Sequence, residues 1–295
     1  MSKTAIFALI ETMRPRQWTK NALVFAGILF SLKIFQIIPL IQSTLAFILF
    51  CLISGTVYIL NDLCDYKRDL AHPEKRNRPI PSGRLPRSLA MFCGISIGII
   101  SVFLSFVLSP AFGWIAASYL LMNIAYSFFL KNIVILDVLI IALGFVLRAA
   151  AGAVVISVAI SEWLLICTFL LALFLALCKR RHELALIKEK AGNHRAVLVH
   201  YTLPLVDQMI SVVTASALMA YALYTISDNV VDKFNTQNLI LTVPFVLFAI
   251  FRYLYLVLTQ NLGGSPERVL VQDKAMVIDI TLWILAVIGI LYLAG

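Results

Sequence analysis

Long apolar stretches, each about 20 residues, fill most of this sequence and constrain what it can fold into. An α-helix of about 20 apolar residues crosses the roughly 30 Å hydrocarbon core of a bilayer. Lipid offers no hydrogen-bond partners to the backbone, so the chain must satisfy its own peptide groups, and helices do so. We predict nine membrane helices, at about 21–38, 41–61, 88–109, 112–130, 133–153, 160–178, 205–227, 238–258 and 276–294.

The composition agrees with a membrane protein and argues against a soluble enzyme. Of the 295 residues, 61% are hydrophobic and 13% are charged, whereas soluble domains carry about 25% charged residues. We therefore expect an all-α fold and a single polytopic membrane domain over residues 1–295. Cytoplasmic cap loops or short helices should lie over a central cavity of this nine-helix bundle, because the longer polar loops fall on one side.

The distribution of cations predicts the orientation of the chain in the membrane. If the N-terminus is cytoplasmic, 21 of the 24 Lys and Arg residues lie on the cytoplasmic side. Basic loops stay on that side of a membrane. The N-terminus and the functional face are therefore expected inside and the C-terminus outside. Several acidic residues fall on the same side, which topology alone does not require, so we expect a site there.

An acidic motif at the end of the second predicted span marks this site. Asp62, Asp65 and Asp69 are spaced at i, i+3 and i+7, which places them on one helix face over roughly 10 Å. Magnesium prefers one or two carboxylates together with phosphate oxygens. The sequence therefore predicts that Asp62, Asp65 and Asp69 hold Mg²⁺, the one cofactor expected, and that Asn61 orients its substrate.

Cations beside this motif are suited to phosphate. Arg68 lies within it, and Arg76 and Arg78 follow in a stretch with two prolines and a glycine, which predicts a rigid turn. Planar Arg side chains suit phosphate oxygens. We expect these arginines to bind a polyphosphate that the metal ion also contacts. A solvated helix end, with the acids paired to neighbouring cations, is the alternative interpretation.

The motif Asn-Asp-x-x-Asp-x-x-x-Asp in a nine-helix bundle resembles the UbiA-type intramembrane prenyltransferase superfamily. Other segments are similar to one branch of it, the decaprenyl-phosphate phosphoribosyltransferases. These segments are Arg14 to Asn21, Ala71 to Ile80, Tyr126 to Lys131, Asp137, Gly144 to Gly152, Lys179 to Glu183, His200 to Thr202 and Gly264 to Glu267. The resemblance covers nearly the whole chain and implies a transferase.

One departure from the superfamily pattern indicates the substrate. Superfamily members that use prenyl diphosphates carry a second Asp-rich motif, whereas this chain has Lys179, Arg180 and Arg181 at the matching place. Three cations favour direct binding of a phosphate monoester. Lys20 and Lys131 provide a further basic cluster. Phosphoribosyl pyrophosphate brings a pyrophosphate and a 5-phosphate, and a polyprenyl phosphate brings one more phosphate. The carboxylates with Mg²⁺ suit the pyrophosphate, and these two basic clusters suit the other two phosphates.

The function expected is transfer of 5-phosphoribose from phosphoribosyl pyrophosphate to a polyprenyl phosphate, for cell-envelope polysaccharide precursors. The alternatives are prenyl transfer from a polyprenyl diphosphate to an aromatic acceptor, and transport of an anionic lipid or metabolite. A bacterial inner membrane location is expected and no nucleic-acid partner, and oligomer formation stays open. Further candidates for the cavity are Gln17, Tyr126, Arg148, Glu183 and Tyr201.

Overall fold

The computed structural model describes residues 3–73, 75–189, 196–260, 263–264, 269 and 272–293. Every regular element in these ranges is helical, which confirms the all-α class. Eight helices of the described part are long and apolar enough to cross a membrane. The chain divides into two compact units, one up to Ile160 with Ala196 and Val197, the other from Ser161 and again from Leu198. The single domain expected over 1–295 stays a prediction.

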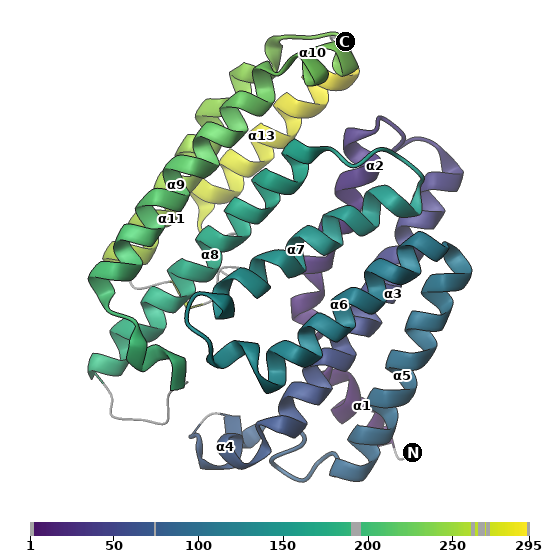
Figure 1. Cartoon of the computed structure of the whole chain (residues 1–295), viewed down its shortest axis with the longest axis vertical. Helices are drawn as coiled ribbons and strands as arrows, with labels where there is room; N and C mark the ends of the chain where they lie inside the picture. The colour runs from purple at the N-terminus through teal and green to yellow at the C-terminus, as the bar shows by residue number, and fades with distance from the viewer. Residues whose placement is uncertain are drawn as a thin grey trace. The chain divides into compact units, whose positions relative to one another are not determined.

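The first unit holds the N-terminal helices and four long spans (Figure 1). Its elements are α1 (Lys3–Thr12), η1 (Pro15–Phe25), α2 (Ala26–Phe30), α3 (Ile37–Cys64), α4 (Tyr66–Ala71), η2 (Lys75–Asn77), α5 (Arg87–Leu108), α6 (Pro110–Phe128), η3 (Leu130–Asn132) and α7 (Leu136–Val155). Here η denotes a 3₁₀ helix. The short α4 and η2 lie in the polar loop after α3, where capping helices were expected.

The first predicted span, 21–38, differs from the others because it is not one continuous helix. The chain forms the 3₁₀ helix η1 and then the five-residue α2, and it turns at Leu32, whose φ is 58°. A run of 11 residues in a 3₁₀ helix is unusual. Tight packing on α7 accompanies it, since Gly27 and Gly152 bring the two backbones together. The predicted count of nine therefore agrees only roughly with the structure.

Small residues explain how α5 packs against α3. The buried residues of α5 recur about every four positions: Ala90, Gly94, Gly98, Ser101 and Ser105. A Cβ on Gly94 or Gly98 would lie 3.0 Å from a side-chain atom of α3, on Ile59 or Thr56 respectively. Such small residues let membrane helices approach closely, where van der Waals contact replaces the hydrophobic effect as the driving force.

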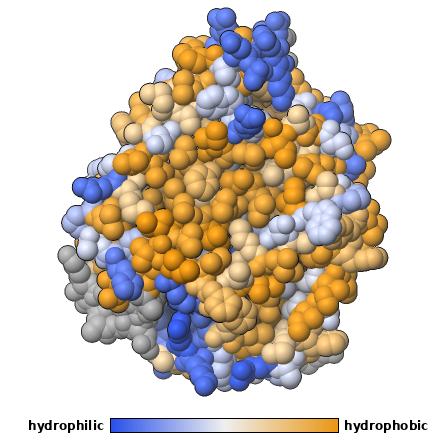
Figure 2. All heavy atoms as spheres, in the orientation of Figure 1, coloured by the Kyte–Doolittle hydropathy of each residue, from blue (hydrophilic) through white to orange (hydrophobic). Residues whose placement is uncertain are grey.

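The other face of α5 is apolar and exposed, as expected for a lipid-facing surface. Met91, Phe92, Ile95, Ile99 and Phe103 are each at least half exposed. Figure 2 shows a face of the protein on which hydrophobic residues predominate and hydrophilic residues gather in smaller patches. The protein is therefore a multi-pass membrane protein.

The second unit holds the remaining spans (Figure 1). Its elements are α8 (Glu162–Glu189), the last residues of η4 (Ala196–His200), α9 (Leu203–Ile226), α10 (Asp228–Phe234), η5 (Asn238–Thr242), α11 (Val243–Gln260) and α13 (Lys274–Leu293). Helix α8 packs along α9, and α11 along α13. Trp283 Nε1 donates to the Tyr221 hydroxyl at 3.0 Å, and this hydroxyl lies 2.7 Å from Thr242 Oγ1, which ties α13, α9 and η5 together.

Candidate active site

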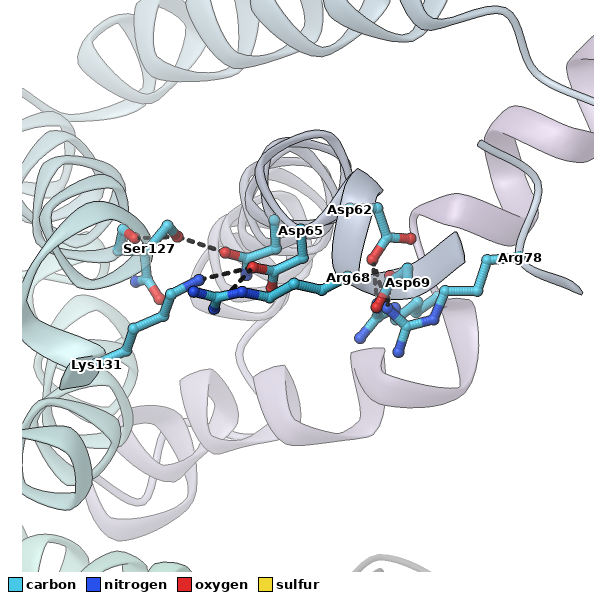
Figure 3. A network of polar contacts seen from close by, with 10 residues as sticks. Asp62, Asp65, Arg68, Asp69, Arg78, Ser127 and Lys131 are labelled. Carbon is cyan, nitrogen blue, oxygen red and sulfur yellow. Dashed lines mark hydrogen bonds and ion pairs between the residues drawn. The ribbon is translucent and has the colours of Figure 1, made fainter. Parts of the chain in front are cut away.

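The acidic motif lies where α3 passes into α4, inside the first unit (Figure 3). Helix α3 ends at Cys64, and Asp65 (φ −90°, ψ 6°) links it to α4. The Asp65 amide still donates to the Asn61 carbonyl at 2.9 Å, and the Asp69 amide donates to the Asp65 carbonyl at 2.9 Å. The chain therefore follows an almost helical path through the motif, and its side chains divide between two sides of that path.

Two of the three carboxylates are buried and bind arginines. The side chains of Asp62 and Asp69 are 2% and 4% exposed. Arg14 Nη2 lies 2.5 Å from Asp62 Oδ1. Arg78 Nη1 contacts both carboxylates, at 3.1 Å from Asp62 Oδ1 and 2.6 Å from Asp69 Oδ2 (Figure 3). Two negative and two positive groups thus neutralise one another at this buried cluster.

The third carboxylate is more accessible and has different partners. Asp65 is 34% exposed, and Lys131 Nζ lies 3.0 Å from its Oδ1 (Figure 3). Arg68 Nη1 lies 4.0 Å from the same oxygen. One helical turn earlier, the Asn61 side-chain oxygen accepts a hydrogen bond from the Ser127 hydroxyl. Asn61, Asp65, Arg68, Ser127 and Lys131 form a second cluster, to which α3, α4, α6 and η3 contribute.

The two clusters refine the expectation of a three-carboxylate metal site. Spacing alone placed Asp62, Asp65 and Asp69 on one face, but the contacts join Asp62 to Asp69 through Arg78 and turn Asp65 toward Lys131. Among the residues that the structure describes, no three His, Cys, Asp or Glu side chains are grouped so that they could hold a metal ion. Metal binding by all three carboxylates stays a prediction.

The donor chemistry of the accessible cluster fits a divalent ion that also contacts phosphate. Asp65 offers a carboxylate and Asn61 an amide oxygen, one helical turn apart on the same helix face. Magnesium commonly takes one or two carboxylates and completes its shell with water and substrate phosphate oxygens. Lys131 and Arg68 lie beside Asp65 and can neutralise those phosphates.

The loop after α4 has the rigid turn that its prolines and glycine predict. The Leu85 amide donates to the Pro79 carbonyl at 2.9 Å, and Gly83 adopts a φ of 78°. Outside this turn, the Arg84 guanidinium binds the two carboxylate oxygens of Glu11 on α1 at 2.7 and 2.9 Å. The hydrogen bond to Glu11 raises the pKa of Arg84 above its usual value. Arg84 also donates to the Asn77 carbonyl at 2.9 Å, next to Arg78.

The remaining predicted residues of the first unit differ in their burial. Gln17 and Lys20 are partly buried on η1, Tyr126 is partly buried on α6, and Arg76 is exposed on η2. Arg148 on α7 is different, because it is 6% exposed and lies in the interior of this unit.

Arg148 binds three neutral groups from different elements. It donates to Asn21 Oδ1 at 2.7 Å, to the Gly144 carbonyl at 2.8 Å and to the Tyr119 hydroxyl at 2.7 Å. Asn21 is fully buried and donates onward to Ser54 Oγ at 3.1 Å. Arg148 therefore joins η1, α6 and α7 directly, and α3 through Asn21.

The basic motif of α8 lies in the second unit. Lys179 is exposed, Arg180 is buried and pairs with Glu183 one turn later, and Arg181 Nε lies 2.6 Å from Asp207 Oδ1 on α9. Tyr201 is buried at 4% exposure. Arg180 and Arg181, both expected to bind phosphate, thus have carboxylate partners within their own unit.

Two contributors to these clusters, Arg14 and Ser127, were absent from the predicted site, and so was Glu11, which binds Arg84 after the turn. Arg14 and Ser127 fall in segments that carry the family resemblance, which was the signal available for them. Glu11 lies 73 positions from Arg84, and nothing in the local sequence links the two. Contacts between segments so far apart in the chain have no periodic signature.

The chain is similar to known proteins over nearly its whole length. A decaprenyl-phosphate phosphoribosyltransferase of Corynebacterium glutamicum is 31% identical over 97% of this chain and 87% of its own length. The enzyme of that name from Mycolicibacterium smegmatis is 30% identical over 96% of this chain and 92% of its own length. A UbiA homolog from Archaeoglobus fulgidus, solved with GPP and Mg²⁺, has a TM-score of 0.71 at 17% identity, covering 96% of this chain and 99% of that one. Residues 22–270 match the UbiA prenyltransferase family, and the chain belongs to that family.

Proposed function

We propose that this transferase moves 5-phosphoribose from phosphoribosyl pyrophosphate to a polyprenyl phosphate. The observation that carries the proposal is the accessible cluster, where one partly exposed carboxylate, Asp65, lies among the cations Lys131 and Arg68. An anion that brings its own divalent ion suits this cluster, as a pyrophosphate does. The two relatives named as decaprenyl-phosphate phosphoribosyltransferases, each matched over nearly the full chain, support the choice of substrates.

In this proposal Asp65 and Asn61 hold Mg²⁺, which neutralises charge on the departing pyrophosphate when it is bound. A solved UbiA homolog from Archaeoglobus fulgidus binds Mg²⁺ together with GPP, which supports a divalent ion in this fold. Ser127 orients the Asn61 side chain by a hydrogen bond to its oxygen. Lys131 and Arg68 bind the pyrophosphate oxygens and stabilise the charge that develops as the bond to ribose breaks.

The proposed reaction exchanges one bond at ribose C1 for another. The bond from C1 to the pyrophosphate oxygen breaks, and its electron pair leaves with pyrophosphate. A phosphate oxygen of the lipid forms the new bond to C1. Because this nucleophile is already an anion, no strong general base is needed, and catalysis consists of positioning and charge neutralisation.

The cations of α8 have a separate role in the proposal. Lys179, Arg180 and Arg181 stand where acids would hold a second metal-bridged diphosphate in prenyl-diphosphate enzymes, and we assign them to a phosphate monoester. Lys20 on η1 serves the same class of ligand. We propose that the reaction takes place at the cytoplasmic leaflet of a bacterial inner membrane, with the N-terminus inside. Most Lys and Arg residues lie on the same side as the N-terminus, and basic loops stay in the cytoplasm.

The direct test supplies the purified protein in nanodiscs with polyprenyl phosphate, Mg²⁺ and labelled phosphoribosyl pyrophosphate, and follows label in the lipid by mass spectrometry. Transfer should require Mg²⁺, stop with EDTA and return when Mg²⁺ is added. Asp65→Asn should lower it at least a hundredfold. Asp228→Asn, at an exposed site on α10, is the matched control and should leave transfer unchanged. Near-normal transfer by Asp65→Asn would reject the proposal.

Prenyl transfer to an aromatic acceptor is the second candidate, favoured by the family to which the chain belongs. A parallel incubation with labelled geranyl or longer prenyl diphosphate and an aromatic acid distinguishes the two. Label in a prenylated aromatic product, with none from phosphoribosyl pyrophosphate, would establish this candidate in place of the first.

A further inference from the structure

We infer that Asp62 and Asp69 are positioning residues, which hold Arg14 and Arg78 in place for a bound diphosphate, and that neither is a metal ligand. This inference rests on the proposed function insofar as the ligand is a diphosphate that binds with a divalent ion. It assigns different roles to the carboxylates of one motif. Asp65 binds the metal, and the other two act through arginines.

Burial is the first observation that separates these carboxylates. The side chains of Asp62 and Asp69 are 2% and 4% exposed, against 34% for Asp65. A hydrated divalent ion that arrives with a substrate needs ligands it can reach, because magnesium gives up its water reluctantly. Asp65 meets this condition, whereas Asp62 and Asp69 are covered.

Existing partners are the second observation. Both Arg14 Nη2 and Arg78 Nη1 contact Asp62 Oδ1, and Arg78 Nη1 also lies 2.6 Å from Asp69 Oδ2. A metal ion placed between Asp62 and Asp69 would have to displace Arg78 Nη1 from both. Removing one partner of a buried ion pair is strongly destabilising, since a buried charge is left uncompensated. The cluster is already neutral and has no net charge to attract a cation.

The arginines retain donors that the carboxylates do not use. Arg78 employs one guanidinium nitrogen for both acids, so its Nε and Nη2 donate no hydrogen bond within the described part of the chain. Arg14 contacts Asp62 through Nη2 and lies over the Tyr58 ring at 4.8 Å. Both side chains are about a third exposed, at 31% and 30%. Each is therefore fixed at one end of its fork, with other N–H groups left for phosphate oxygens.

Asp62 also joins three segments that are distant in sequence. Arg14 occupies the left-handed residue between α1 and η1, with φ 54° and ψ 65°. Arg78 begins the turn after η2, and Asp62 itself lies in the last turn of α3. One buried carboxylate thus sets the positions of both arginines relative to the helix that carries Asp65. The fixed geometry removes the entropy cost of ordering two long side chains at each binding event.

A double-mutant cycle tests the inference with Mn²⁺ and inorganic pyrophosphate as probes. Asp69→Asn, Arg78→Met and the double variant are purified in nanodiscs. Bound Mn²⁺ is measured by electron paramagnetic resonance at saturating pyrophosphate, and pyrophosphate affinity by calorimetry at saturating Mn²⁺. Asp65→Asn is the comparison variant. Asn keeps the shape of the Asp side chain that it replaces. Asp69→Asn is preferred to Asp62→Asn because Asp62 then still holds Arg78.

Asp69→Asn should weaken pyrophosphate binding about tenfold and change Mn²⁺ affinity less than twofold, whereas Asp65→Asn should weaken Mn²⁺ binding at least tenfold. In the Arg78→Met background, Asp69→Asn should have less than a twofold further effect, because its action passes through Arg78. Arg78→Lys keeps the charge without the fork and should bind pyrophosphate with intermediate affinity.

The inference is overturned if Asp69→Asn weakens Mn²⁺ binding as much as Asp65→Asn does, or if the effects of Asp69→Asn and Arg78→Met multiply. An unchanged pyrophosphate affinity in Asp69→Asn overturns it as well. If Asp69→Asn or Arg78→Met does not fold, the Arg78→Lys variant decides. If Arg78→Lys binds pyrophosphate as tightly as the parent protein, the inference that a positioned Arg78 guanidinium binds the diphosphate is rejected. Neither probe is phosphoribosyl pyrophosphate, so these binding measurements do not depend on whether the protein transfers ribose. A failure of the proposed function and a failure of this inference can therefore be told apart.

Discussion

The contact between Gly152 and η1 makes the most quantitative prediction. A Cβ added to Gly152 would lie 1.9 Å from the carbonyl oxygen of Val24 and 2.7 Å from its carbonyl carbon. Ordinary contact begins near 3.4 Å, so Gly152→Ala must push η1 away from α7 by about 1.5 Å. The obstructing atoms are backbone atoms, which cannot move aside by changing a rotamer.

The cost follows from two opposing effects. Overpacking a tight contact costs about 1–3 kcal/mol, and a contact with backbone belongs at the upper end of that range. Alanine regains about 1 kcal/mol over glycine as a helix former. We therefore expect Gly152→Ala to lower the free energy of unfolding by about 2 kcal/mol. Transfer should also fall at least tenfold, because η1 carries Lys20, and a displacement of about 1 Å near a reaction can cost up to 10²-fold.

Unfolding in detergent, followed by tryptophan fluorescence, measures the stability, and transfer to lipid measures the activity. Gly144→Ala on the same helix is the control. Its Cβ would meet ordinary contacts at 3.5 Å or more, and we expect unchanged or slightly raised stability. Equal stability and activity of Gly152→Ala and Gly144→Ala would refute the reasoning, since it would mean that η1 does not rest against α7 as described.

Other perturbations test separate parts of the fold. Tyr119→Phe should cost about 1–3 kcal/mol, because it leaves a buried N–H group of Arg148 without its acceptor. Arg148→Met should cost more, because it leaves several buried acceptors without their donor, and chemical unfolding ranks the two. The hydrogen bond from Arg252 lowers the pKa of Asp273. The stabilising effect of this pair is therefore present above the unfolded pKa near 3.9 and is lost as the pH falls through the folded pKa. Asp273→Asn should reduce the change of melting temperature with pH between pH 5 and pH 2. Gly83→Ala should cost about 1–2 kcal/mol in the left-handed conformation, although no atom lies within 4 Å of the added Cβ, and Gly83→Asn should cost less.

Most of the membrane architecture could be predicted because hydrophobicity and helix signals act locally. The span predicted at 88–109 is α5, Arg87–Leu108, and the next begins with Pro110 at its first turn. Proline at that position and an extended residue before it are strong helix-start signals.

The first span shows where such signals fail. Residues 21–38 are apolar enough for a membrane helix, yet η1 and α2 form in their place. The cause lies far along the chain, in Gly152 and Arg148 of α7, which pack on Val24 and bind Asn21. A hydropathy window averages the residues of one segment, so it contains no information on the distant residues that pack against that segment.

The acidic motif shows the same limit at the level of chemistry. Spacing placed Asp62, Asp65 and Asp69 on one helix face, whereas in the structure Arg78 joins only Asp62 to Asp69 and Asp65 contacts Lys131. It could not indicate which carboxylates are covered, because that depends on Arg14 and Arg78, which arrive from other segments. A motif of identical acids can therefore contain two kinds of group, one that meets the ligand and one that holds the residues that meet it. On the inference drawn above, the arginines, rather than the acids they neutralise, set how tightly a diphosphate is bound at this end of α3.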